Sequence, residues 1–515
     1  MLGRVLLLAL SLLLRASAEW VGYDRPSIYS KSTQYTVKVN GTFASTVNYA
    51  DYDYVQLSMT EGSNTEFRIA TVSGSKITGT PVISPKQLPI DYKVEGNELI
   101  FNLKKVHYII LKLNDLKELV LMIDRLESDA PPSKGTGIMN VLNHGADNTG
   151  KAVTDGIQKA LDAAGKKPGT TVYVPPGLYL IGNLIIPSQT SLYLAGGSVL
   201  RMTGKKADYK VLYTKSDLGD GTWWIQTAFD SKDIRIYGRG TIDGNAEAMK
   251  KDKLIASMVV PVGTTNFKMD GVLVRDSSFW AVIPTQVTGA KLTNIKILNN
   301  INGKQNDGID VQESSNVKVW RAIAIANDDS FSTKTWLKDV GTTVPFPYDP
   351  RPLRDVSFDE CLAWTRCYGY KVGQGVYTDQ NNVLFQNSVV YYGGVGLGID
   401  HKFGSGTARN ISFINMDLER LAGEPGGTGT WLAVFVEDVK KGVGPIEEVT
   451  VKNVRARSTG KYHGKLAGFD ESSYLDGVTI SDVYMLENKT AAKTLGELDI
   501  KWTQFSKNIQ IKNSK

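Results

Sequence analysis

A short phrase recurs from residue 234 to the C-terminus, and it limits the fold more than any other feature of the sequence. The phrase is an Asn or Asp followed by alternating aliphatic residues, and successive copies begin 25 to 39 residues apart. Each copy predicts a short strand bounded by turns, with no helical pattern between copies. Units of roughly 20–30 residues with several short strands are typical of a parallel β-solenoid. The copies begin at Ile234, Phe267, Leu292, Val317, Val356, Val383, Ile411, Val449, Val478 and Ile509.

The region before the repeat has a different pattern. Between Trp20 and Leu126, short alternating strands broken by turn residues predict an antiparallel β-sandwich. Residues 128–137 are polar, with two prolines and two glycines, and predict a linker. A helix is expected from Thr154 to Ala164, because a capping residue precedes apolar residues at helical spacing. We therefore expect an all-β protein with a β-sandwich at 19–127, the linker at 128–137, and a solenoid domain at 138–515.

The N-terminus predicts the compartment. Arg4, an apolar run at 5–14 and Ala16-Ser17-Ala18 together predict a secretory signal peptide over residues 1–18. The apolar run is too short to cross a bilayer. Triplets that accept N-linked glycans fit an extracellular, secreted glycoprotein. These triplets begin at Asn40, Asn410 and Asn488.

Composition excludes several classes of protein. Lys and Arg number 59 against 53 Asp and Glu, and the basic residues are scattered, so nucleic acid is not an expected partner. No later segment is apolar enough to enter a membrane, and no nucleotide fingerprint or metal-ligand spacing is present. We expect a monomer with no cofactor and no metal. Cys361 and Cys367 could form a disulfide or remain free thiols.

Three acids are spaced to meet on one face of a solenoid. Asp307 lies in Asn306-Asp307-Gly308-Ile309-Asp310, and Asp328 and Asp329 follow 21 and 22 residues later, close to one coil. Equivalent residues of successive coils stack about 4.8 Å apart, so these carboxyl groups should converge on the exterior. Adjacent strand residues point to opposite faces, so Asp328 and Asp329 can share a cleft only at a bend.

Crowded carboxyl groups cannot all ionise, so at least one pKa should rise and leave an acid beside a base. Glycoside hydrolysis requires that pair: an acid to protonate the leaving oxygen and a carboxylate to activate water or attack the sugar. The alternative is that the aspartates cap turns or bind calcium, as carboxylates at bends do.

These motifs resemble those of the pectin-lyase-like right-handed β-helix enzymes, especially glycoside hydrolase family 28, the polygalacturonase family. Residues 306–310 are similar to its Asn-Thr-Asp-Gly-x-Asp motif and residues 327–329 to its Asp-Asp motif, while 277–280 resemble its Ser-Pro-x-Trp phrase. The resemblance covers roughly residue 140 to the C-terminus. It implies that Asp328 is the general acid, that Asp307 and Asp329 position and activate water, and that the anomer is inverted.

Two departures affect the expected substrate. Tyr368 stands where the family has the histidine of Gly-His-Gly, and Asp400-His401-Lys402 stands where it has Arg-Ile-Lys. Holding a substrate carboxylate needs a cationic fork, so plain polygalacturonan is not the expected substrate. Glycoside hydrolase family 49, the dextranase and isopullulanase family, also joins a sandwich to a β-helix. A neutral α-glucan fits the missing arginine better, whereas the coil spacing fits family 28 better.

The remaining candidates concern binding. Aromatic side chains in a cleft can stack on sugar rings, and an insertion at 337–354 is expected to wall the cleft. Two further function classes stay open, a lyase or epimerase on the same scaffold and a non-catalytic glycan-binding solenoid. A polysaccharide is the expected partner in each case. The predicted substrate-binding residues are Asp310, Tyr368, His401, Lys402, Trp280 and Trp336, with Trp223 and Trp224 as further aromatic candidates.

Overall fold

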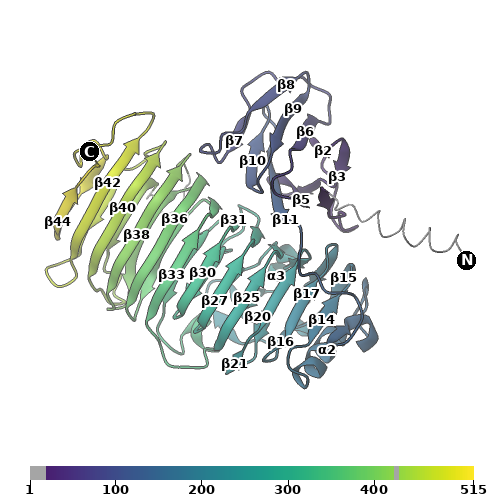
Figure 1. Cartoon of the computed structure of the whole chain (residues 1–515). Coiled ribbons are helices and arrows are strands. Elements are labelled where there is room, and N and C mark those ends of the chain that lie inside the picture. Colours follow the sequence, from purple (N-terminus) through teal and green to yellow (C-terminus); the bar gives the residue numbers. More distant parts are fainter. Residues whose placement is uncertain (1–18, 423–428, 515) are drawn as a thin grey trace, which may run out of the picture. The chain divides into compact units, whose positions relative to one another are not determined.

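A computed structural model describes residues 19–422 and 429–514 of the chain. It divides into two compact units, Met1–Asp129 and Ala130–Lys515, each of which is described by itself (Figure 1). The signal peptide predicted at 1–18 lies outside the described residues. None of the helices that the described residues form is long and apolar enough to span a bilayer.

The first unit packs two sheets around one apolar core. Alternation of buried and partly exposed residues along strands such as Thr65–Thr71 turns one face of each sheet toward that core. The six-stranded sheet contains β1 (Trp20–Gly22), β4 (Val47–Tyr49), β5 (Tyr52–Met59), β7 (Val82–Ser84), β10 (Tyr108–Lys112) and β11 (Glu118–Arg125). The five-stranded sheet contains β2 (Tyr35–Val39), β3 (Thr42–Ala44), β6 (Thr65–Thr71), β8 (Tyr92–Glu95) and β9 (Glu98–Leu103).

The predicted sandwich is confirmed, with one difference in strand direction. All its strand pairs are antiparallel except β5 and β11, which run parallel along their whole lengths from Tyr52 opposite Glu118 to Met59 opposite Arg125. A parallel pair needs a long crossover, and the chain between these two strands supplies it. Sequence alternation alone carries no information on strand direction.

The second unit is the parallel β-helix that the repeat predicts. Its strands stack in chain order, as the row from β14 to β44 shows in Figure 1. Crossovers between parallel strands are right-handed in nearly all proteins, which gives the helix its hand. Helix α2 (Gly156–Gly165) forms near its start, as predicted, and buries Ile157, Ala160, Leu161 and Ala164; α3 (Ala246–Lys251) is shorter.

Three sheets line the β-helix. The 22-stranded sheet contains β12 (Ile138–Asn140), β13 (Thr149–Val153), β14 (Thr171–Val174), β15 (Gly177–Leu180), β17 (Ser191–Leu194), β18 (Ser198–Arg201), β21 (Ser231–Lys232), β22 (Arg235–Gly238), β23 (Thr241–Asp243), β25 (Thr264–Asp270), β26 (Leu273–Arg275), β27 (Thr288–Thr293), β28 (Lys296–Leu298), β30 (Ser315–Trp320), β31 (Ile323–Ile325), β33 (Leu353–Asp359), β34 (Leu362–Trp364), β36 (Gln380–Tyr392), β38 (Ala408–Leu418), β40 (Ile446–Ala456), β42 (Leu475–Met485) and β44 (Ser506–Ile511). The four-stranded sheet contains β16 (Leu184–Ile186), β19 (Tyr213–Lys215), β20 (Gly219–Thr227) and β24 (Leu254–Val260). The seven-stranded sheet contains β29 (Ile309–Gln312), β32 (Phe331–Thr335), β35 (Tyr368–Val376), β37 (Val395–Phe403), β39 (Thr430–Val436), β41 (Gly464–Ala467) and β43 (Ile500–Trp502).

The recurring phrase marks a backbone turn in every coil. The residue before each aliphatic phrase has a left-handed conformation, such as Asn266 at φ 56° and Asn410 at φ 54°. Asn and Asp tolerate this region better than other side chains, and Gly adopts it freely. The register corrects one predicted copy, because Ala290 rather than Leu292 lies opposite Phe267 and follows a left-handed glycine.

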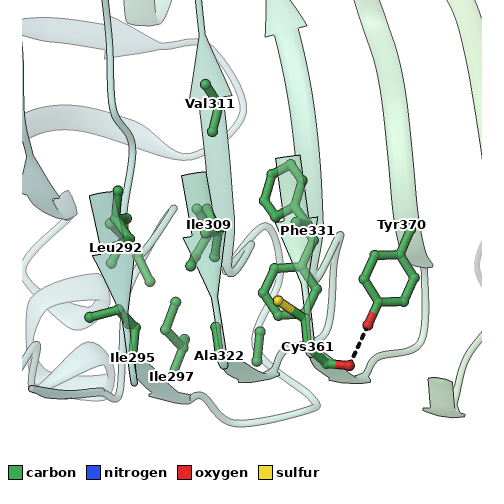
Figure 2. Packing of buried hydrophobic residues seen from close by; sticks show 14 of the residues in the cluster. Leu292, Ile295, Ile297, Ile309, Val311, Ala322, Phe331, Cys361 and Tyr370 are labelled. Atoms are coloured by element: carbon green, nitrogen blue, oxygen red, sulfur yellow. Dashed lines mark hydrogen bonds between the residues drawn. The ribbon is translucent and has the colours of Figure 1, made fainter. Parts of the chain in front are cut away.

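The interior of the β-helix is a continuous column of apolar side chains. Figure 2 shows Ile309, Phe331 and Tyr370 from successive strands β29, β32 and β35 lying in this interior, where the Tyr370 hydroxyl donates to the Cys361 carbonyl at 2.9 Å. Aromatic rings stack from coil to coil, and the Phe385 ring lies 5.0 Å from Phe358 and 5.3 Å from Phe413. This packing fixes the register that also arranges the outer face.

Candidate active site

The three predicted acids meet at a bend before the seven-stranded sheet. Asp307 precedes β29 and Asp328 and Asp329 precede β32, and the Gly308 amide donates to the Asp329 carbonyl at 2.8 Å. Ile309 pairs with Phe331, so the two segments are one coil apart, as their spacing predicted. A Cβ at Gly308 would lie 2.2 Å from the Ser330 carbonyl oxygen, so only glycine permits this close approach.

A buried lysine holds the acids together. Lys334 Nζ lies 2.7 Å from Asp307 Oδ2, 2.8 Å from Asp310 Oδ2 and 3.5 Å from Asp329 Oδ2. Lys334 is 3% exposed, and its ammonium also lies over the Trp280 ring, 4.7 Å from the centroid. The Lys334 ammonium therefore forms ion pairs with acids from two successive coils.

A second buried lysine continues the pattern on the next strand. Lys371 Nζ lies 3.2 Å from Asp329 Oδ2 and 3.6 Å from Asp400 Oδ2. Asp400 Oδ1 in turn lies 3.7 Å from Lys402 Nζ, and Lys402 lies 3.2 Å from Glu437 Oε2. Acids and lysines thus alternate across four neighbouring strands of the outer face.

The lysines separate the pKa values of the adjacent acids. Burial raises the pKa of Asp328, and the charge of Asp329 raises it further. Burial acts on Asp329 in the same direction, but Lys371 and Lys334 outweigh it and hold the pKa of Asp329 below its usual value. Within the described residues, no lysine or arginine nitrogen lies within 4.0 Å of an Asp328 oxygen. One carboxyl is therefore disposed to carry a proton and its neighbour a charge.

Asp307 and Asp400 behave differently from Asp329. Burial raises the pKa of Asp307 well above its usual value, although Lys334 opposes the shift. Burial also raises the pKa of Asp400, with Lys371 and Lys402 opposing it. Asp307 is 2% exposed, and its Oδ1 has no hydrogen-bond partner among the described residues. That oxygen is available to a water molecule or a substrate hydroxyl.

Asp328 is the most accessible of the three acids and has a thiol beside it. The Thr365 hydroxyl donates to the Asp328 carbonyl, and the Cys367 amide donates to the Thr365 hydroxyl at 2.9 Å. Asp328, Asp329 and Cys367 each place one atom within 4.8 Å of the others. We assign no metal to this group, because Lys334 and Lys371 already neutralise Asp329 and burial raises the pKa of the Cys367 thiol.

Both cysteines are free thiols. Cys361 packs in the interior, where burial raises the pKa of its thiol to about 12, and Cys367 is partly exposed near the acids. Of the two possibilities that the sequence leaves open, the structure has the unpaired one.

Aromatic rings border the acids. Trp280 stacks on Phe279 at 4.6 Å and on Trp336 at 6.2 Å, and Trp336 also lies 6.1 Å from the Phe403 ring. The amide of Trp336 donates to Glu313 Oε1 at 3.1 Å, which ties the start of the insertion to β29's own coil. Trp336 is partly exposed, whereas Trp280 is 8% exposed and packs beneath it.

Several predicted binding residues do not reach the outer surface. His401 is fully buried and its Nε2 lies 2.8 Å from the Gly406 carbonyl, because strand alternation turns it away from the face that Asp400 occupies. Asp310 is fully buried between Lys334 and the Ser332 hydroxyl. The prediction that these two contact substrate is wrong. Trp223 and Trp224 are buried packing residues as well.

Tyr368 lies beside the acids but beneath a lysine. Its ring is 5% exposed, and Lys371 Nζ lies 4.4 Å above its centroid. The ring packs with Val395, Ala433 and Phe435 in a small outer cluster. The Tyr368 ring is therefore a packing surface for the Lys371 ammonium.

The sequence reasoning missed Lys334 and Lys371. Each is an outward-facing lysine in a strand whose neighbouring residues point into the apolar core, and in the register Lys371 pairs with Ser332, which pairs with Asp310. The sequence does contain a signal for such a lysine: it lies about one coil from an acid, at a position whose side chain points to the same face of the sheet.

Comparison with known proteins places this geometry in context. Residues 138–397 match the family described as rhamnogalacturonase A/epimerase, pectate lyase-like. An exo-poly-alpha-D-galacturonosidase of Dickeya chrysanthemi is 31% identical over 163 residues, which are 28% of this chain and only 26% of that relative.

Solved structures share the fold over more of the chain. A hyperthermoactive exopolygalacturonase from Thermotoga maritima superposes with a TM-score of 0.59 at 19% identity, covering 75% of this chain and 93% of that one. Dex49A from Penicillium minioluteum superposes with a TM-score of 0.57 at 12% identity, covering 96% of each chain. These likenesses confirm the predicted fold and the resemblance to the β-helix glycoside hydrolases of families 28 and 49.

Proposed function

The chain belongs to the rhamnogalacturonase A/epimerase, pectate lyase-like family, and from that premise we propose that it is a polysaccharide hydrolase that cleaves glycosidic bonds with inversion. The observation that carries the proposal is that the adjacent acids Asp328 and Asp329 differ in their contacts with lysine. Lys334 and Lys371 both contact Asp329, and neither lies within 4.0 Å of Asp328. Glycoside hydrolysis requires an acid that protonates the leaving oxygen and a carboxylate that activates water.

In the proposed reaction, Asp328 donates its proton to the glycosidic oxygen as the bond from that oxygen to the anomeric carbon breaks. Water attacks the anomeric carbon from the opposite side, and Asp329 accepts the proton that the water loses. Asp307 positions this water through its unpaired Oδ1. The product has the opposite anomeric configuration, and Asp328 and Asp329 regain their starting states by exchange with solvent.

Lys334 and Lys371 act as positioning residues in this proposal. Asp310, which accepts a hydrogen bond from the Ser332 hydroxyl, contacts Lys334, and Asp400 contacts Lys371, so both ammonium groups stay directed at Asp329. Asp400 stands where the polygalacturonase family is expected to have arginine. It binds a lysine of the protein, so this position does not supply a cation to the substrate. The proposed hydrolase therefore has an altered substrate-carboxylate site.

That substitution favours a second candidate, an endo-hydrolase of a neutral α-glucan such as dextran. Both candidates use the same acid and base, and they differ in the sugar that the cleft accepts. A reducing-sugar assay against polygalacturonate, rhamnogalacturonan, dextran and pullulan separates them. The product anomer, followed by NMR during early turnover, tests inversion.

The matched variants are Asp328→Asn and Asp355→Asn. Asp355 is an exposed turn residue of the 22-stranded sheet, where Asn suits the left-handed backbone. We expect the first variant to abolish hydrolysis and the second to retain it. Full activity of Asp328→Asn would contradict the acid assignment. An ultraviolet-absorbing product would indicate a lyase, unchanged chain length an epimerase, and binding without any product a glycan-binding protein.

We further propose that the protein is secreted as a glycosylated monomer, with a sandwich domain at 19–127, a linker at 128–137 and the catalytic domain at 138–515. The asparagines of the three predicted glycan acceptors, Asn40, Asn410 and Asn488, are all exposed. Expression in a secreting eukaryotic cell should yield extracellular protein that begins at Glu19. Retention of residues 1–18 or failure to leave the cell would contradict this proposal.

A further inference from the structure

A buried carboxylate holds both ends of the insertion at 337–354. Glu313 Oε1 accepts a hydrogen bond from the Trp336 amide at 3.1 Å, immediately before the insertion. Glu313 Oε2 accepts one from the Arg351 amide at 3.3 Å, near the end of the insertion, and another from Gln286 Nε2 at 2.7 Å. One side chain therefore joins backbone positions from opposite ends of this segment.

Gln286 uses the rest of its side-chain amide on the same segment. Its Oε1 accepts a hydrogen bond from the Tyr348 amide at 3.2 Å, and its Nε2 lies 3.1 Å from the carbonyl oxygens of both Tyr348 and Asp349. Gln286 and Glu313 are each 2% exposed. A buried polar group is costly without hydrogen-bond partners, and the backbone of residues 336–351 supplies those partners here.

Gln286 and Glu313 occupy the same turn in successive coils, because Thr285 pairs with Gln312. Both have left-handed backbones, at φ 50° and φ 47°, where Asn, Asp and Gly are the favoured residues. A strained backbone is a reason to look for a function, and both of these side chains reach the insertion. The turn that shapes each coil is therefore also the place where the insertion is attached.

The attached segment packs on the aromatic rings that border the acids. Phe346 of the insertion is 8% exposed and belongs to the same apolar cluster as Trp280. Trp336 stacks on Trp280 at 6.2 Å, and Lys334 Nζ lies 4.7 Å from the centroid of Trp280. A continuous series of contacts therefore leads from Glu313 to the lysine that binds the candidate catalytic acids.

We propose that Glu313 is a positioning residue whose carboxylate fixes the insertion as a rigid wall of the cleft and fixes Trp336 as a surface for a sugar ring. This proposal rests on the proposed function and adds a residue that serves the same cleft. Aromatic rings bind sugars through their faces, so the orientation of the Trp336 ring decides whether it can contribute. Because Glu313 acts through Trp336, it should affect substrate binding more than proton transfer.

Glu313→Gln tests the proposal with little change in side-chain shape. An amide has one acceptor oxygen, and its NH₂ group cannot accept a hydrogen bond from the N–H groups that face it. We expect hydrogen exchange of the backbone amides at 336–351, followed by mass spectrometry, to become about three- to tenfold faster. On whichever polysaccharide the wild type cleaves, KM should rise by about the same factor, with kcat within about twofold of wild type.

A double-mutant cycle tests whether Glu313 acts through Trp336. Trp336→Ala alone should raise KM, because it removes the proposed surface for the sugar. In the Glu313→Gln background the same change should raise KM much less, because the ring is already displaced. A merely structural role of Glu313 would give independent effects on KM. Near-ultraviolet circular dichroism of the stacked Trp280 and Trp336 rings should change in Glu313→Gln as well.

Glu360→Gln is the matched control. Glu360 is also a glutamate with a left-handed backbone, at φ 52°, but it is exposed in the turn between β33 and β34 of the 22-stranded sheet. This variant should leave hydrogen exchange at 336–351, KM and kcat unchanged. Thermal unfolding of each variant confirms that it is folded.

Three results would overturn the role of Glu313: unchanged exchange at 336–351 in Glu313→Gln, additive effects of Glu313→Gln and Trp336→Ala on KM, or a loss confined to kcat. The hydrolase proposal fails separately, when the wild type releases no reducing ends from any polysaccharide. In that case the exchange measurement still decides whether Glu313 fixes the insertion, and the Kd of a bound polysaccharide replaces KM in the cycle. Absence of any polysaccharide binding would overturn the assignment of Trp336 as a sugar surface.

Discussion

The 22-stranded and seven-stranded sheets belong to the same coils but differ in the exposure of the outward-facing residues compared here. On the 22-stranded sheet, the outward positions Lys268, Lys291 and Lys318 pair in register and are exposed. On the seven-stranded sheet, the outward positions Asp310, Ser332 and Lys371 pair in register and are buried. Both sheets turn apolar residues inward with the same alternation, so the coil alone does not explain the buried charges.

This difference between the two sheets distinguishes residues that the fold needs from residues that serve a function. Exposed side chains on the 22-stranded sheet remain solvated and contribute little to stability. Buried acids and lysines carry a large desolvation cost that their mutual attraction only offsets, so a fold does not need them. The 22-stranded sheet also buries charges, such as Asp243 and Lys296. The buried lysines of the seven-stranded sheet differ because they contact Asp307 and Asp329 of the candidate active site, and we infer that this face serves chemistry.

The largest expected effect is the loss of activity in Asp328→Asn. Removing a general acid costs about 10²- to 10⁴-fold in rate, and we expect a loss of this size in kcat on whichever polysaccharide the wild type cleaves. The measurement is the initial rate of reducing-end release. Asp355→Asn on the 22-stranded sheet should keep the wild-type rate, and equal losses in the two variants would remove the functional distinction between the sheets.

The same variant also predicts a sign in the pH dependence of stability. The folded pKa of Asp328 is raised, so its contribution is present below the unfolded value and is lost as pH rises through the folded value. Asp328→Asn should therefore become more stable relative to wild type as the pH rises above about 4, the ordinary pKa of an aspartate. The folded pKa of Asp329 is lowered, so the stability that its carboxylate contributes is present above the ordinary aspartate pKa, and Asp329→Asn should be less stable than wild type there. Chemical unfolding at several pH values measures both, and equal signs would refute the assignment.

The next effect concerns the interior that both sheets share. Phe385→Ala removes the middle ring of the stack from Phe358 to Phe413, and a buried Phe→Ala change costs about 3–5 kcal/mol. We expect this loss in the free energy of unfolding, measured with denaturant, and a kcat close to that of wild type for the folded fraction. A large change in kcat with unchanged stability would show that the interior, and not only the outer face, tunes the acids.

The coupling of the buried charges gives the next prediction. Lys371→Met leaves Asp329 and Asp400 without a shared cation, and breaking a buried ion pair in this way costs about 3–5 kcal/mol. The double variant Lys371→Met/Asp400→Asn also removes one of the unpaired acids, and it should recover part of the lost free energy of unfolding. A double-mutant cycle on the free energy of unfolding measures the coupling. Lys318→Met, an exposed lysine of the 22-stranded sheet, should change stability by less than about 0.5 kcal/mol, and additive effects of the two buried changes would contradict the network.

Sequence reasoning was accurate where a residue's role depends on chain spacing. The repeat predicts the coils, and the 21- and 22-residue separations bring Asp328 and Asp329 to Asp307. It failed where the role depends on side-chain direction or on contacts across strands. The distance along the chain after Tyr368 predicts that His401 lies beside the cleft, although strand alternation turns it inward. Chain spacing does not reveal the role of Lys371, because its acid partners come from other coils.

The smallest expected effect tests the turn that creates the repeat. In the series of left-handed residues on the 22-stranded sheet, Glu448 at φ 57° occupies a position held by Asn410 in the preceding coil. A side chain other than Asn, Asp or Gly is strained there by about 1–2 kcal/mol, and Asn relieves part of that strain. Glu448→Asn should therefore raise the free energy of unfolding by about 0.5–1 kcal/mol with no change in activity. A loss of stability would mean that contacts of the Glu448 carboxylate outweigh the backbone preference, and that exposed charges on this sheet also matter.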